Sequence, residues 1–195
     1  MKWWKCDGHP IFRYRNQAFK FRPSTLCLMN APIDPSRHPD AGVQSLLNTA
    51  RRYCALINTP GPDVAAWLGD IAALLPHLHA AMTSVHRNVL HAQHDHPVDL
   101  DARFELFSHL RALLADRDGY FLEFDRAHDG ADAMTGSLAD DLTDIYCELK
   151  HGLDAFDANP ERALETWFLG YEAHWGQHLV DAQRHLANLA AANRM

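Results

Sequence analysis

The sequence lacks the short patterns that identify the commonest enzyme sites. It contains no G-x-S-x-G serine motif, no glycine-rich phosphate loop and no C-x-x-C pair. Its four cysteines are widely spaced, which argues against a disulfide framework and against a zinc knuckle. Unpaired cysteines suit a reducing compartment, so we expect a cytoplasmic protein.

Long apolar runs are also missing. No stretch approaches the roughly 18 consecutive apolar residues of a membrane-spanning helix. The basic N-terminus has no continuous apolar segment of the kind found in signal peptides. We therefore expect no membrane partner, and the 47% of hydrophobic residues is enough to form a buried core.

Positive charge is scarce beyond the N-terminus. Residues 1–29 hold six basic residues and one acidic residue, whereas residues 30–195 hold 12 basic and 24 acidic residues, giving a formal net charge of −7. After Lys20 the only lysine is Lys150. An acidic body repels phosphate backbones, so we expect no nucleic-acid partner.

The first 40 residues differ in composition from the rest. They hold five of the ten prolines and three of the four lysines, and no apolar period ties them to a bundle. We predict an N-terminal extension over residues 1–40 and a helical domain over residues 41–195. The extension is either a flexible arm or the result of a start assigned too early, with Met29 as the true start. On either explanation, residues 1–28 should be dispensable for folding.

From residue 41 onward, apolar residues recur at intervals of three and four, which predicts an all-α fold. We expect a single-domain bundle of about five helices. Capping and turn residues place them near 41–58, 62–88, 99–115, 137–157 and 159–192. Pro62 and Asp63 suit the first turn of the second helix, Ser137 and Asn159 should cap the last two, and Pro160 should begin the first turn of the last. Pro76 should bend the second helix, and Gly170 and Gly176 mark bends in the last. No run alternates convincingly as a strand.

Two stretches carry a family resemblance: SLADDLTDIYCELKHGL at 137–153 and ALETWFLGYEAHWGQHLVDAQRHL at 163–186. They resemble the bacterial family catalogued as domain of unknown function 5063, whose pattern runs DDLxDIYxDLKxGL and then HWGxH. Looser similarity spans about residues 45–190. The matching residues are Asp140, Asp141, Asp144, Ile145, Tyr146, Lys150, Gly152, Trp167, His174, Trp175, Gly176 and His178. The resemblance implies an all-helical fold and no particular activity.

The chain is rich in histidine, with 14 in all, and the last helix carries a polar row at the edge of its apolar face. The row consists of His174, His178, Asp181 and His185. The helix predicted at 137–157 offers further polar groups. Asp141 and Glu148 flank its apolar stripe on one side, and Asp144 lies in its first turns. Tyr146 and Lys150 flank the stripe on the other side. Because the two helices are joined by a short turn, they should pack antiparallel. The carboxylates are then expected to meet the histidines.

Three interpretations of this row remain open. It could consist of histidine–carboxylate hydrogen bonds that seal a helix interface. It could be a divalent-metal site in which His174 and His178, at i and i+4, are ligands and Asp141, Glu148 or a third histidine completes the set. It could also be a His–Asp pair that transfers protons without a metal. Lys150 is either a nucleophile with a lowered pKa or a surface lysine whose stem lies on apolar surface.

These observations favour an uncharacterised cytosolic helical protein that binds a protein or a small ligand without catalysis. The alternative is a metal-dependent bundle enzyme that uses His174 and His178 with carboxylates of the 137–157 helix. The sequence leaves open whether the protein is an enzyme, and a divalent metal is the one cofactor that its residues suggest.

Overall fold

The computed structural model describes residues 41–85, 99–122 and 136–195. The predicted extension over residues 1–40, with its two explanations, lies outside the described residues. Within them the elements are α1 (Ala41–Asn58), α2 (Val64–Ser84), α3 (Leu100–Leu114), a 3-10 turn (Ala115–Arg117), β1 (Gly119–Tyr120), β2 (Gly136–Ser137), α5 (Leu138–Phe156), α6 (Pro160–Gly170), a π-helical turn η2 (Tyr171–Trp175) and α7 (Gly176–Ala191). Counted with α6, η2 and α7 as one continuous helix, the described residues contain five α-helical segments. The predicted all-α bundle is confirmed.

The helices begin where capping residues satisfy free backbone N–H groups. The Asp63 side chain accepts hydrogen bonds from the second and third amides that follow it, and Ser137 and Asn159 each accept one from the third amide that follows. Pro160 occupies the first turn of α6, as predicted. The prediction for the second helix was wrong at its start: Asp63 is the cap, so it and Pro62 precede the helix. The described helix α2 also ends earlier than expected, at Ser84.

One feature of the fold was not predicted, a pair of two-residue antiparallel strands. Gly119 pairs with Ser137, and Tyr120 pairs with Gly136. Strands this short contain too few residues to show an alternating pattern, so periodicity could not reveal them. A Cβ on Gly136 would overlap the Tyr120 ring, which explains the glycine at this position. The pairing holds Tyr120 beside the first turn of α5.

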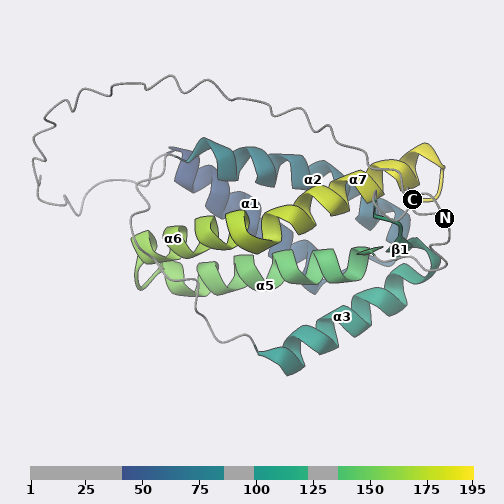
Figure 1. The fold of residues 1–195 in the computed structure, drawn as a ribbon, viewed down its shortest axis with the longest axis horizontal. Helices are drawn as coiled ribbons and strands as arrows, with labels where there is room; N and C mark the ends of the chain where they lie inside the picture. The colour runs from purple at the N-terminus through teal and green to yellow at the C-terminus, as the bar shows by residue number, and fades with distance from the viewer. Residues whose placement is uncertain (1–40, 86–98, 123–135) are drawn as a thin grey trace, which may run out of the picture. The chain divides into compact units, whose positions relative to one another are not determined.

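Helix α5 lies at the centre of the helical packing. It contacts α1, α3, α6 and α7, and Figure 1 shows it between α7 and α3. Trp167 and Trp175 are fully buried against it and its neighbours. Gly152 permits the close approach of α6, because a Cβ at this position would overlap the Trp167 indole. The indole N–H of Trp167 then donates to the Glu148 carbonyl oxygen at 3.0 Å.

Helix α2 is long and apolar enough to cross a membrane by length and composition alone, with a mean hydropathy of 1.2. The sequence was not expected to contain such a segment. Its apolar residues are interspersed with alanines and with Asp70, His77 and His79, so no uninterrupted run stands out. Its large apolar side chains, among them Trp67, Leu68 and Ile71, are buried in the bundle. The core helix of a bundle shows the same composition.

Candidate functional site

The candidate site lies where α5 faces η2 and the start of α7. His178 is the centre of its contacts: Nδ1 is 2.8 Å from Oδ1 of Asp141, and Nε2 is 3.3 Å from Oδ2 of Asp144. The prediction that carboxylates of the 137–157 helix meet the histidines is therefore confirmed for His178. The hydrogen bond to Asp141 raises the pKa of His178, although partial burial acts against it.

His174 reaches the same group of carboxylates from one turn earlier. Its Nε2 is 3.8 Å from Oδ2 of Asp144, and its Nδ1 is 3.5 Å from Oε1 of Glu148. The His174 and His178 rings meet edge to face, with centroids 4.9 Å apart. The His174 side chain is 47% exposed and that of His178 is 22% exposed, so the two imidazoles form the solvent side of the cluster.

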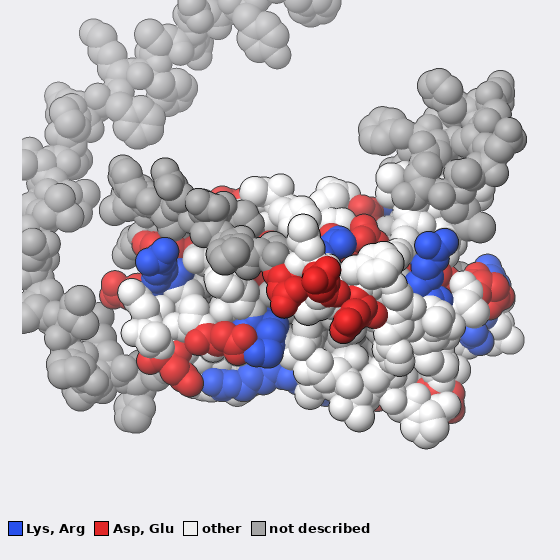
Figure 2. Space-filling view, turned by 90° about the horizontal axis from the view of Figure 1, so that it is seen from below, with Lys and Arg blue, Asp and Glu red and all other residues white. Residues whose placement is uncertain are grey.

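The acidic side of the cluster is buried. Asp141, Asp144 and Glu148 are only 4%, 5% and 5% exposed. Burial raises the pKa of the Asp141 carboxyl, while its hydrogen bonds to His178 and to the Tyr120 hydroxyl, the latter 2.6 Å long, act in the opposite direction. Figure 2 shows acidic side chains gathered on the face seen from below, in keeping with the negative charge of the chain.

Arg103 of α3 brings a permanent positive charge to these carboxylates. Its Nε donates to Oδ1 of Asp144 at 2.7 Å, and its Nη2 donates to Oδ1 of Asp140 at 2.9 Å. One guanidinium thus faces Asp144 from the side opposite the histidines. Arg103 and Tyr120 were not predicted as site residues, because each belongs to an element that reaches α5 only through tertiary packing.

A π-helical turn positions His174. Residues Tyr171–Trp175 form this turn between the two glycines at which bends were predicted. The Gly176 N–H donates to the Tyr171 carbonyl, which comes so close that a Cβ on Gly176 would overlap it. A π turn advances the chain by a residue more than an α turn and is frequent at functional sites. It changes the direction of His174 relative to a uniform helix.

The remaining members of the predicted row do not join the cluster. Asp181 accepts from Gln177 at 2.8 Å and from Arg184 at 2.9 Å, both on its own helix. His185 Nε2 lies 2.7 Å from the Arg117 carbonyl oxygen, and its ring stacks on that of Tyr120 at 4.6 Å. Burial lowers the pKa of His185. The expected meeting of the histidines with carboxylates of the 137–157 helix therefore fails for His185, because Arg117 lies over this end of α7.

Tyr146 and Lys150 lie on another face of α5, away from the histidines. The Tyr146 hydroxyl donates to Asn58 Oδ1 at 2.8 Å, and the Lys150 ammonium pairs with Asp154. Hydrogen bonding to Asp154 raises the pKa of Lys150, which is opposite to the shift that a nucleophilic amine requires. The surface-lysine interpretation therefore fits Lys150.

The comparisons with known proteins agree with the helical fold. A solved structure of protein BF1032 from Bacteroides fragilis matches with a TM-score of 0.63 at 20% identity, over 77% of this chain and 92% of that chain. At this identity the similarity shows the fold alone. No curated protein matches the chain. The sequence profile described as domain of unknown function (DUF5063) matches residues 38–192, and the chain belongs to this family.

Proposed function

We propose that the domain binds a divalent transition-metal ion, held by Asp144, His174 and His178, as a non-catalytic small-ligand-binding protein. The observation that carries the proposal is their convergence: one ligand atom from each lies within 4.8 Å of the others. Metal–ligand bonds of about 2.0–2.2 Å place neighbouring ligand atoms about 3–3.5 Å apart. The two histidine–Asp144 distances of 3.3 and 3.8 Å need only a small contraction.

The hydrogen-bond pattern leaves the same three atoms for a cation. When His178 donates its Nδ1 proton to Asp141, the neutral ring presents the lone pair of Nε2 toward a carboxylate oxygen. Two lone pairs at 3.3 Å repel unless a proton or a metal ion lies between them. A metal ion satisfies both atoms without protonating the ring.

Each of the three side chains also has a second contact that fixes its orientation. Asp141 faces Nδ1 of His178, Glu148 faces Nδ1 of His174, and Arg103 holds Oδ1 of Asp144. Metal-binding histidines typically donate their second N–H to a carboxylate or carbonyl, which sets the tautomer. This arrangement is the one expected around a metal ion.

The balance of charge in the cluster also favours a bound metal ion. Asp141, Asp144 and Glu148 are buried side by side on α5, and among the described residues the permanent cation that bonds to this group is Arg103, at Asp144. Buried charges are normally paired or coordinate metals. Two imidazoles with one carboxylate suit Zn²⁺ or Fe²⁺ better than Mg²⁺ or Ca²⁺, which prefer oxygen ligands alone.

Metal content of the full chain, expressed without a histidine tag, tests the proposal. We expect the protein to retain one Zn²⁺ or Fe²⁺ per chain after dialysis, measured by mass spectrometry of the metal. His174→Ala should lose it, whereas His109→Ala, an exposed histidine on α3, is a matched control that should retain it. Equal retention by both variants would leave histidine–carboxylate packing as the explanation of the cluster.

The second candidate function is a metal-dependent enzyme. Three protein ligands leave coordination positions open, as catalytic metal sites do. His174 also borders a hollow of about 390 Å³ that is lined by Tyr171, Glu172 and Gln177. Hydrolysis of activated esters or phosphates by the metal-loaded chain, lost in Asp144→Asn, would favour this function over simple binding.

A cytoplasmic location also belongs to the proposal. Cys54 and Cys147 are free thiols within the described residues, which is compatible with a reducing compartment.

A further inference from the structure

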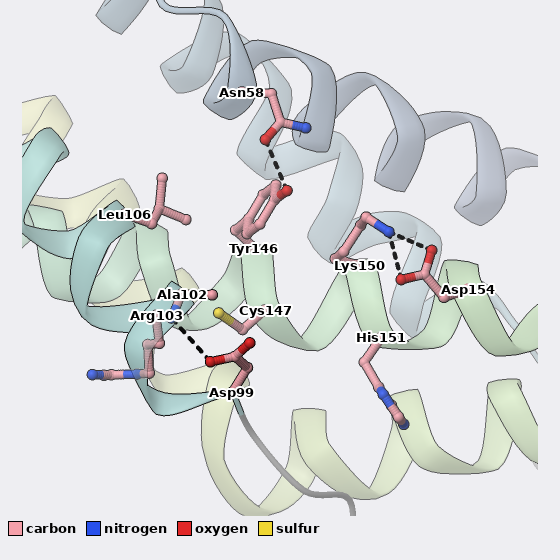
Figure 3. Close-up of a pocket in the computed structure, with 10 residues that line it drawn as sticks. All are labelled: Asn58, Asp99, Ala102, Arg103, Leu106, Tyr146, Cys147, Lys150, His151 and Asp154. Carbon is pink, nitrogen blue, oxygen red and sulfur yellow. Dashed lines mark hydrogen bonds and ion pairs between the residues drawn. The ribbon is translucent and has the colours of Figure 1, made fainter.

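A second hollow lies on another face of α5 from His174 and His178, between α5, α1 and α3, and His151 is among the residues that line it. Its volume is about 380 Å³, which falls in the range of small-molecule sites. Figure 3 shows Leu106, Cys147 and the ring of Tyr146 around it, with Lys150 at one side. None of the three proposed metal ligands lines it, although Arg103, which bonds to Asp144, does.

The inner surface of this pocket is formed by uncharged groups. Burial raises the pKa of the Cys147 thiol to about 11, so the group is a neutral thiol at physiological pH and serves as apolar lining. Leu106 and the Tyr146 ring add further apolar surface. The Tyr146 hydroxyl donates to Asn58, which fixes the ring at the edge of the pocket. Such a surface suits a compact apolar body.

The charged groups around the pocket differ in the hydrogen bonds and ion pairs that they already make. Asp99 caps α3 by accepting from two backbone amides. Arg103 bonds to Asp140 and Asp144, and in Figure 3 its guanidinium points away from Tyr146 and Cys147. The Arg103 charge is therefore directed at carboxylates of α5 and not at a ligand in the pocket.

Of the lysine and arginine side chains among the described residues that line the pocket, Lys150 is the one not bound to Asp140 and Asp144, and His151 lines the pocket beside it. Its partner, Asp154, is one helical turn away, and their side chains are 44% and 62% exposed. An exposed pair of this kind is weak. The ammonium has three donors, so it can bind a second anion while it keeps its contact with Asp154.

We propose that this pocket binds a small monocarboxylate, with its apolar body against Tyr146, Leu106 and Cys147 and its carboxylate at Lys150. The Lys150 ammonium, which bonds to both oxygens of Asp154, keeps a third donor for the carboxylate of the ligand, and the apolar wall matches a compact ring or branched chain. The site does not depend on the metal ion, so the two proposals can fail separately.

The test uses three probes of the same shape: benzoate, benzamide and benzylamine. Each is titrated into the isotope-labelled full chain in the presence of EDTA, and amide chemical shifts are followed by NMR. We expect benzoate to give saturable shifts at Ala102, Leu106 and Cys147. Benzamide should bind about tenfold more weakly, because it lacks the charge that strengthens the hydrogen bond. Benzylamine should give no saturable shift at these residues.

Two variants and one control sharpen the result. Lys150→Met keeps the apolar stem and should reduce benzoate binding to the level of benzamide. Ala102→Trp should fill the pocket and abolish binding of both. Arg162→Met, which removes an exposed cation on α6, should leave the benzoate titration unchanged. Binding of benzylamine as tight as that of benzoate, a lack of saturation with all three probes, or unchanged benzoate binding in Lys150→Met would overturn the proposal.

Discussion

Replacing Asp144 by asparagine separates metal binding from helix packing. Asparagine keeps the shape of the side chain and an oxygen that can accept from Arg103, but it removes the charge of the proposed ligand. Because Asp144 lies close to two other buried carboxylates, Asp141 and Glu148, loss of its charge also relieves repulsion among the three. In the presence of a chelator, Asp144→Asn should therefore melt within a few degrees of the wild type.

The metal should then distinguish the two proteins. A ligand present at 100 times its Kd stabilises the native state by about 2.7 kcal/mol. For a domain of about 150 residues, each kcal/mol raises the melting temperature by about 2–4 °C. The wild type should thus gain about 5–11 °C with saturating Zn²⁺ or Fe²⁺, and Asp144→Asn should gain little.

Scanning calorimetry with chelator and with metal measures both quantities in the same samples. Fe²⁺ requires anaerobic conditions, and Mg²⁺ serves as the control cation that the ligand set should bind poorly. A wild-type melting temperature that is the same with chelator and with Zn²⁺ or Fe²⁺ would refute the reasoning. So would an Asp144→Asn variant that keeps the full metal-dependent gain.

Three further predictions concern the same region. With chelator, His178→Ala should lower the free energy of unfolding by about 1–3 kcal/mol, because it leaves a buried acceptor unpaired, and His174→Ala should lower it less. Urea unfolding measures both losses, and equal losses would contradict the geometry. His185→Gln should lower the free energy of unfolding most near pH 8 and least near pH 5. A histidine whose folded pKa is lowered stabilises the fold above about pH 6.5 and loses that contribution as the pH falls. A loss of stability in the variant that grows on acidification would show the opposite pKa shift. Gly176→Ala should destabilise by about 1–3 kcal/mol because its Cβ would overlap a carbonyl of the π turn, and unchanged thermal unfolding would mean that the turn relaxes easily.

Local sequence determined the helices and half of the site. Ser137 and Asn159 cap α5 and α6 as predicted, because capping depends on a side chain and amides only a few residues away. The meeting of His178 with Asp141 also followed from local features. Two amphipathic helices joined by a short turn must pack antiparallel, and this brings the polar edges of their apolar faces together.

Tertiary structure decided the rest of the site. Arg103 and Tyr120 reach the carboxylates from α3 and β1, and no local pattern relates them to α5. The predicted row was divided for the same reason: His185 faces the Arg117 carbonyl and not a carboxylate of α5. The partner of each polar group depends on which element covers it.

The direction of the His174 side chain could not be predicted from the average period of a helix. The sequence indicated a break near Gly176, but a uniform 3.6-residue period cannot show that the chain forms a π turn there. A single added residue in one turn rotates every side chain before it relative to those after it. The sequence thus determined which residues could bind a metal, and the tertiary structure decided that Asp144, His174 and His178 converge, because convergence depends on turn geometry and on the packing of α5 against η2 and α7.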